Sequence, residues 1–177
     1  IRLGKCNLAC AWCDTDYLKF GMMRLSDILS RLQTYAARNI IITGGEPTIQ
    51  PHLSVLLDAL KAQGYRLCIE TNGLKPAPVQ IDYVAASPKA CYAEKYRQQC
   101  IEAADEVRIV ADGDVLAFCA EMEQKIRAAH YYLSPCEIDG QMNIYDTIRQ
   151  IGLLNARADA QVHWQLSVQT HKWAGIE

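Results

Sequence analysis

The chain has 177 residues, half of them hydrophobic, and 18 Lys and Arg against 20 Asp and Glu give a formal net charge of −2. This length and composition predict one domain over residues 1–177, long enough to bury a core. The near-neutral charge gives no basis for direct nucleic-acid binding. No apolar run reaches the roughly 20 residues of a transmembrane helix, and no signal-peptide pattern is present, so we expect a cytoplasmic protein without membrane contact.

The predicted elements alternate between strands and helices along the whole chain. A first strand covers Ile1–Leu3, and helices are expected at 24–38, 53–60, 92–104, 115–129 and 144–156. Further strands are expected at 40–43, 66–70, 81–86, 106–110, 130–133 and 163–168. Such alternation predicts a parallel sheet with right-handed crossovers. The chain is too short for an ordinary eight-unit barrel, so we expect an α/β fold of the incomplete (β/α) TIM-like barrel type.

A polar or glycine-containing segment follows most of the predicted strands. In barrel-like α/β folds the active site lies at the carboxyl ends of the strands. We therefore expect these segments to meet at one edge of the sheet. They are Gly44-Gly45-Glu46-Pro47, Thr71-Asn72-Gly73, Ser87-Pro88-Lys89, Ser134-Pro135-Cys136 and Gln169-Thr170-His171-Lys172.

Three of the eight cysteines, Cys6, Cys10 and Cys13, share one short loop after the first strand. A disulfide framework is typical of small, loop-rich secreted chains, and this chain is neither small nor loop-rich. Grouped thiolates instead select zinc, copper(I) or an iron–sulfur cluster. Three ligands are one short of a closed site, so either a distant fourth cysteine completes it or one metal position stays open. Three other cysteines have apolar neighbours and are expected in the core: Cys68, Cys100 and Cys119.

The spacing of the three grouped cysteines resembles that of the radical SAM superfamily. There, three cysteines hold a 4Fe-4S cluster, and S-adenosylmethionine occupies the fourth iron through its amino and carboxylate groups. Gly44-Gly45-Glu46-Pro47 is similar to the stretch that receives the methionine amino group. A narrower resemblance, to the 7-carboxy-7-deazaguanine synthases, extends over nearly the whole chain. It rests on Cys13-Asp14-Thr15, Thr43–Pro47, Glu70-Thr71-Asn72-Gly73, Ser87-Pro88-Lys89, Asp105-Glu106 and Ser167–Lys172.

This resemblance implies a carbon–nitrogen lyase that converts 6-carboxy-5,6,7,8-tetrahydropterin to 7-carboxy-7-deazaguanine with loss of ammonia, a step toward queuosine. It implies a 4Fe-4S cluster, S-adenosylmethionine and Mg²⁺ as cofactors. An adenosyl radical takes hydrogen from the substrate and later returns it, so S-adenosylmethionine is regenerated. The resemblance also implies a homodimer and an external, flavodoxin-like electron donor.

The resemblance assigns roles to individual residues. Cys6, Cys10 and Cys13 hold the cluster, and Thr15 supplies a hydroxyl ligand to Mg²⁺, which prefers oxygen. The implied substrate-binding residues are Arg2, Thr43, His171 and Glu177, the last through its terminal carboxylate. The implied S-adenosylmethionine contacts are Trp12, Cys13, Asp14, Gly45, Glu46, Ser87, Pro88, Lys89, Ser134, Pro135, Cys136 and Glu137.

Two departures and two alternatives accompany this hypothesis. The family places a Gln-Gly-Glu-Gly-type substrate loop before the first strand, so we expect it to precede Ile1. Ser134-Pro135 replaces the Gln-Pro often seen in the family.

A radical SAM activase of a glycyl-radical enzyme, or a zinc- or cluster-binding interaction module, would use the same cysteines. The segment from Gln169 to Lys172 favours the synthase over both.

Overall fold

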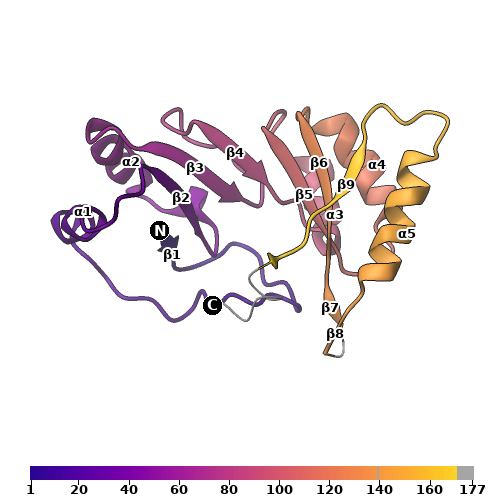
Figure 1. Ribbon diagram of the computed structural model, residues 1–177, viewed down its shortest axis with the longest axis horizontal. Helices are drawn as coiled ribbons and strands as arrows, with labels where there is room; N and C mark the ends of the chain where they lie inside the picture. The colour runs from indigo at the N-terminus through magenta and orange to yellow at the C-terminus, as the bar shows by residue number, and fades with distance from the viewer. Residues whose placement is uncertain (139, 171–177) are drawn as a thin grey trace.

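The computed structural model describes residues 1–138 and 140–170. Seven parallel strands form one sheet in the order β1-β2-β3-β4-β5-β6-β9 (Figure 1). The two edge strands do not pair with each other, so the sheet stays open and the predicted incomplete barrel is confirmed. The strands are β1 Arg2–Leu3, β2 Asn39–Gly44, β3 Arg66–Thr71, β4 Tyr83–Ala86, β5 Glu106–Ala111, β6 His130–Pro135 and β9 Trp164–Leu166.

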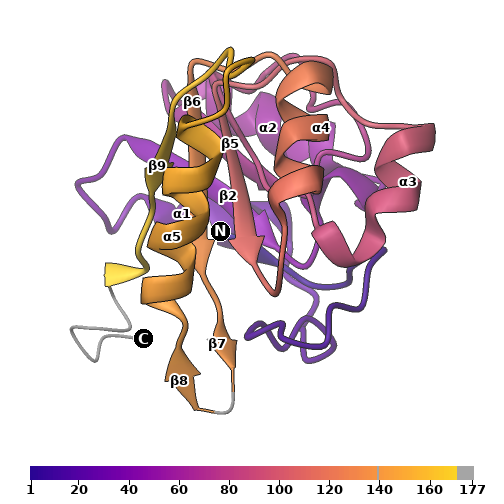
Figure 2. The same cartoon turned by 90° about the vertical axis from the view of Figure 1, so that its right-hand side faces the viewer.

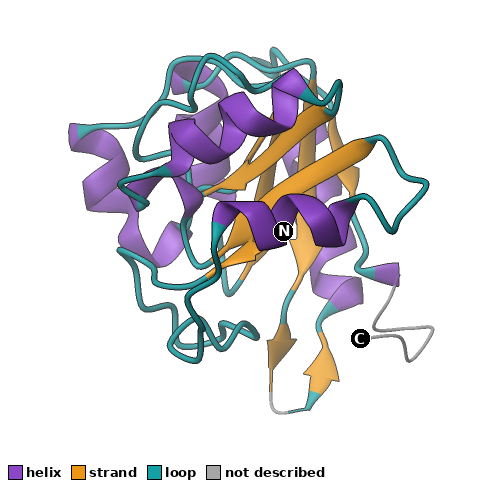
Figure 3. Cartoon of the chain, turned by 90° about the vertical axis from the view of Figure 1, so that its left-hand side faces the viewer, coloured by secondary structure: helices purple, strands orange, loops and turns teal. Residues whose placement is uncertain are grey.

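The helices lie around the outside of the sheet, as Figure 3 shows by colour. They are α1 Leu25–Leu32, α2 Leu53–Ala62, α3 Ala93–Gln98, α4 Leu116–Lys125 and α5 Ile144–Asn155, with 3₁₀ turns η1 Pro47–Ile49 and η2 Ala90–Tyr92. None of the helices in the described ranges is long and apolar enough to cross a membrane.

Three helices are shorter than the predicted ranges 24–38, 92–104 and 115–129, because a local hydrogen bond at α1 and bonds to distant segments at α3 and α4 replace the helical ones. Beyond α1, the Thr34 hydroxyl donates to the Arg31 carbonyl at 2.8 Å. Beyond α3, the amide of Ile101 donates to the Gly73 carbonyl at 2.9 Å. Beyond α4, the amide of Arg127 donates to a carbonyl in the loop before β5, Glu102, at 2.9 Å. Tertiary pairing therefore overrides helix periodicity at the ends of α3 and α4.

A hairpin of β7 Glu137–Ile138 and β8 Gln141–Met142 follows β6 and was not predicted. Figure 2 shows it projecting beyond the end of β6. Strands of two residues are too short for an alternating pattern to mark them. Gly140 has φ +77°, which only glycine adopts readily, and turns the chain between them.

The core forms two apolar clusters on the helix-covered side of the sheet. One joins β2 and β3 to α1 and α2, and the other joins β4, β5, β6 and β9 to α3, α4 and α5. The second cluster contains buried Cys119, and half-buried Cys100 packs against it, as predicted. The prediction for Cys68 is wrong: its neighbours Leu67 and Ile69 are fully buried, and strand alternation puts half-buried Cys68 on the opposite, inner face.

Candidate active site at the carboxyl ends of the strands

The cysteine loop, residues 4–24, connects β1 to α1 without regular secondary structure. Figure 1 shows it passing along the edge of the sheet toward which the strands point. Cys6 and Cys10 are half-buried, and Cys13 is exposed. The amide of Cys13 donates to the Cys10 carbonyl at 3.1 Å, which makes a tight turn between these two thiols.

Gly44 and Gly45 let the end of β2 approach the cysteine loop closely. Gly44 has φ +146°, and a Cβ on Gly45 would lie 2.0 Å from the carbonyl oxygen of Lys5 and 3.0 Å from the Cβ of Cys6. The next amide, that of Glu46, donates to the same Lys5 carbonyl at 2.8 Å. The two glycines are therefore required by backbone packing beside the first cluster cysteine.

The carboxylate of Glu46 is 1% exposed and joins the ends of β2 and β3. It accepts hydrogen bonds from the Thr71 hydroxyl and the Asn72 amide, both at 2.7 Å. It also accepts the amide and the hydroxyl of Thr48, at 3.0 and 2.7 Å. A buried carboxylate needs such donors. The predicted contact of Glu46 with S-adenosylmethionine is not tested by this arrangement and stays a prediction.

Three hydrogen bonds hold the cysteine loop to segments that follow β3, β4 and β5. The Asn72 side chain donates to the Asn7 carboxamide oxygen at 2.8 Å, and the amide of Ala9 donates to the Tyr92 hydroxyl at 3.0 Å. The indole Nε1 of Trp12 donates to a carboxylate oxygen of Asp112 at 2.7 Å. The partners Tyr92 and Asp112 were not predicted from the sequence, because neither belongs to a recognisable motif.

Lys89 brings a positive charge to the cysteine loop from the segment after β4. Its ammonium donates to the Ser87 hydroxyl at 2.7 Å and lies 5.4 Å from the centroid of the Trp12 ring. Burial lowers the pKa of this ammonium, and the nearby thiols, Cys10 first among them, act in the opposite direction. Lys89 therefore lies beside Trp12, and the predicted contacts of Ser87, Lys89 and Trp12 with S-adenosylmethionine stay predictions.

The three thiols of the cysteine loop are the residues that would hold an iron–sulfur cluster. Burial, and then the neighbouring Cys91, raise the pKa of Cys10 to about 12, and burial raises that of Cys6. Bound iron would deprotonate such thiols outright. Among the residues that the structure describes, no three His, Cys, Asp or Glu side chains converge closely enough for one metal ion. Three separate thiols beside a lysine ammonium suit the larger, anionic iron–sulfur cluster.

The predicted substrate residues Arg2 and Thr43 lie on neighbouring strands, and Arg2 contacts Thr15, the predicted Mg²⁺ ligand in the cysteine loop. Arg2 is the register partner of Thr43, and its guanidinium donates to the Thr15 hydroxyl at 3.2 Å. The Thr43 hydroxyl donates to the Glu70 carboxylate at 2.8 Å, and Arg108 lies 3.9 Å from the same carboxylate. Glu70 and Arg108 were not predicted to belong to the site.

The predicted residues Ser134 to Glu137 lie at the end of β6 or just after it, and two others lie outside the described chain. Ser134 is buried, and its hydroxyl has no hydrogen-bond partner among residues 1–138 and 140–170. The amide of Cys136 donates to the Asn143 side-chain oxygen at 2.7 Å, and exposed Glu137 begins the hairpin. His171 and Glu177 lie outside the described residues, so their predicted roles stay predictions.

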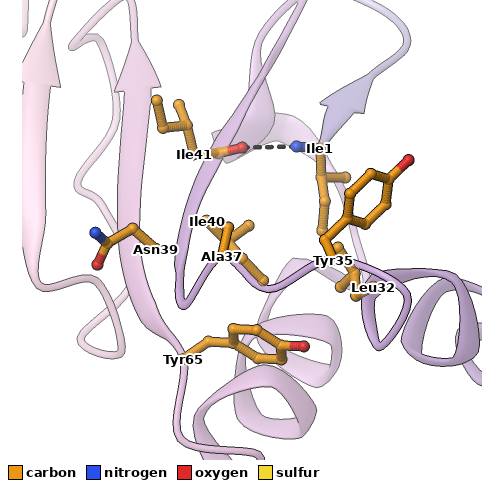
Figure 4. A pocket seen from close by; sticks show the side chains of 8 residues that line it. All are labelled: Ile1, Leu32, Tyr35, Ala37, Asn39, Ile40, Ile41 and Tyr65. Carbon is orange, nitrogen blue, oxygen red and sulfur yellow. Dashed lines mark hydrogen bonds between the residues drawn. The ribbon is translucent and has the colours of Figure 1, made fainter.

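A pocket elsewhere on the chain contains none of the predicted site residues. It lies between α1 and the amino-terminal ends of β1 and β2, as Figure 4 shows. The amino group of Ile1 donates to the Ile41 carbonyl at 2.7 Å in its wall. Its lining is mainly apolar and contains no cluster of metal-binding side chains. The lining residues are Ile1, Leu32, Tyr35, Ala37, Asn39, Ile40, Ile41 and Tyr65.

Comparison with known proteins identifies the family to which the chain is similar. Residues 1–92 match the model of the radical SAM superfamily. The chain is 83% identical, over its whole length and 84% of the relative, to the 7-carboxy-7-deazaguanine synthase of Neisseria meningitidis serogroup B. The enzyme of the same name from Haemophilus influenzae is 56% identical over the whole chain and 83% of the relative. A crystal structure of QueE from Escherichia coli superposes with a TM-score of 0.64 and 25% identity, covering 95% of this chain and 83% of that one.

The fold and the cysteine loop define a radical SAM enzyme, whose cofactors are a 4Fe-4S cluster and S-adenosylmethionine. Within that superfamily, the chain belongs to the 7-carboxy-7-deazaguanine synthases, lyases of the queuosine pathway. The alternatives, an activase of a glycyl-radical enzyme or a zinc- or cluster-binding interaction module, are not favoured by these relatives.

Proposed function

We propose that this edge of the sheet binds 6-carboxy-5,6,7,8-tetrahydropterin and converts it to 7-carboxy-7-deazaguanine with loss of ammonia. The observation that carries the proposal is the meeting of Arg2, Thr15 and Thr43 beside the cluster cysteines. A guanidinium and two hydroxyls suit a substrate that carries one carboxylate and a ring rich in hydrogen-bonding atoms.

Each of the three side chains has a separate role in this proposal. Arg2 pairs its planar guanidinium with the substrate carboxylate. Thr15 ligates a Mg²⁺ ion that also holds substrate oxygens, because this hard cation takes oxygen ligands and keeps several waters. Thr43, already oriented by donating its proton to Glu70, accepts a hydrogen bond from the pterin. His171 and the terminal carboxylate of Glu177 are proposed to contact the same substrate.

The predicted S-adenosylmethionine contacts surround the cysteine loop along the strand ends. When bound, the cluster and S-adenosylmethionine supply the adenosyl radical that takes a hydrogen atom from the substrate. The chain orients that cofactor through side chains and backbone from four segments. These are Trp12-Cys13-Asp14, Gly45-Glu46, Ser87-Pro88-Lys89 and Ser134-Pro135-Cys136-Glu137.

We also propose the setting in which the enzyme works. The cluster needs reduced thiolates and an electron source, which favours the cytoplasm and a flavodoxin-like donor. A homodimer is proposed from family resemblance.

The test is anaerobic reconstitution with iron and sulfide, followed by incubation with the carboxypterin, S-adenosylmethionine, Mg²⁺ and a reductant. We expect carboxydeazaguanine in the product analysis. Thr15→Val, which keeps the shape and removes the hydroxyl, should raise the Mg²⁺ concentration needed for half-maximal rate, and Thr15→Ser should not. A fully loaded enzyme that forms no carboxydeazaguanine would refute the proposed substrate.

A further inference from the structure

Asp112 lies one residue beyond β5 and contacts the cysteine loop across 100 residues of sequence. Its Oδ2 accepts the indole N–H of Trp12 at 2.7 Å. Trp12 stands between Cys10 and Cys13, inside the turn closed by the Cys13 amide and the Cys10 carbonyl. Trp12 and Asp112 are both half-buried, so water competes with this charge-assisted bond less than at an open surface.

The same indole also carries the contact with Lys89. The Lys89 ammonium lies 5.4 Å from the ring centroid, a distance at which the ring face attracts a cation. One side chain thus joins a carboxylate after β5 to an ammonium after β4. The contacts with Asp112 and Lys89 together determine the orientation of the ring and of the turn that contains Trp12.

The cysteine loop depends on such outside contacts because it has no secondary structure of its own. Ordering an irregular backbone costs roughly 1–2 kcal/mol of conformational entropy per residue. Asn72 and Tyr92 hold the first part of the loop, at Asn7 and Ala9. The bond to Asp112 acts on the second part, where two of the three cluster thiols lie.

We propose that Asp112 is a positioning residue for the iron–sulfur cluster: through Trp12 it holds the Cys10–Cys13 turn in the geometry that binds iron. Partners that orient metal ligands from outside commonly affect metal affinity by 10–100-fold. The proposal rests on the cluster that family membership assigns, and not on the substrate proposed above. Loss of the bond should leave the fold intact and the cluster weakly held.

The experiment compares Asp112→Ala, Trp12→Phe and the double variant with the unchanged chain after anaerobic reconstitution. We measure the iron and sulfide bound per chain and the rate at which a chelator removes the cluster. S-adenosylmethionine is left out, so that the predicted contact of the Trp12 ring with that cofactor does not affect the result. We expect each single variant to lose the cluster on the order of tenfold faster. The double variant should lose it no faster than Asp112→Ala alone, because Asp112→Ala already removes the bond from Trp12, together with the contact of Asp112 with the Cys91 thiol.

Two further variants sharpen the test. Asp112→Asn keeps an oxygen acceptor for the indole and should hold the cluster nearly as well as the unchanged chain. Asp159→Ala removes an exposed carboxylate from another loop and should have no effect. Circular dichroism of the metal-free variants checks folding, and Trp12→Phe keeps the test open if Asp112→Ala does not fold. The proposal would be overturned if Asp112→Ala retained the cluster normally, or if the rates of cluster loss in the two single variants added up in the double variant. It would also be overturned if Asp112→Asn and Asp112→Ala lost the cluster equally fast.

Discussion

Gly45 occupies a position where a methyl group has no room. Because a Cβ there would lie 2.0 Å from the Lys5 carbonyl oxygen, Gly45→Ala should force the end of β2 away from the cysteine loop. We expect the free energy of unfolding in urea to fall by about 2 kcal/mol, as is usual for overpacking. Gly152→Ala is the matched control: nothing lies within 4 Å of its Cβ position in α5, so the chain should gain about 0.5–1 kcal/mol. Equal stabilities of the two variants would contradict this interpretation.

Glu46 shows that a predicted cofactor residue also has a structural role. Glu46→Ala would leave the Thr71 hydroxyl and the Asn72 amide buried without an acceptor. We expect the free energy of unfolding to fall by about 3 kcal/mol, since donors paired with a charged group lose most when it is removed. Glu46→Gln retains one acceptor oxygen and should lose less. Denaturant titration of the metal-free chain measures both, and a loss under about 0.5 kcal/mol for Glu46→Ala would be inconsistent with the observed bonds.

At the scale of elements, Asp82 connects α2 to β3. It accepts the Lys61 ammonium at 2.7 Å and the Leu67 amide at 2.7 Å, and these contacts, Lys61 first, lower its pKa from the ordinary 3.8. A lowered pKa means that the folded state favours the carboxylate. The stabilisation is present above the ordinary pKa and is lost as pH falls through the lower folded value. The midpoint of thermal unfolding should therefore be higher for the unchanged chain than for Asp82→Asn at pH 6. This difference in midpoint should shrink below pH about 4. A difference that stays constant to pH 2 would contradict this.

Glu123 connects α4 to α5 and β9. Its side chain is 5% exposed and accepts Arg157 at 2.6 Å and the indole of Trp164 at 2.9 Å. Removing one partner of such a pair leaves the other unpaired, so Glu123→Ala should lower the free energy of unfolding by about 3 kcal/mol. Glu121→Ala, on the same helix, breaks only partly exposed ion pairs and should cost less than about 1 kcal/mol. Similar losses in urea titrations of both variants would contradict the assignment.

At the scale of the whole molecule, two core clusters share one continuous sheet. Val84 in β4 packs against both clusters, and β3 and β4 pair along four residues. We expect the metal-free chain to unfold in a single transition, since neither cluster can expose its half of the sheet alone. Calorimetry and far-ultraviolet circular dichroism should give the same midpoint. Two resolved transitions would show that the clusters unfold independently.

The sequence by itself determined the alternation of strands and helices and the grouping of motifs at one edge of the sheet. Both follow from patterns a few residues long, and parallel strands necessarily bring their carboxyl ends together. The three cluster cysteines and the family resemblance were likewise visible within short segments, and the comparisons confirmed the family.

The tertiary structure alone decided which distant groups meet. The ends of α3 and α4 moved because backbone amides found partners in other loops, and Cys68 proved to face inward because strand alternation placed its neighbours against the helices. The bond from Trp12 to Asp112 spans 100 residues. Local periodicity carries no information about such a pair, because it is the packing of whole strands that brings the two side chains within hydrogen-bonding distance.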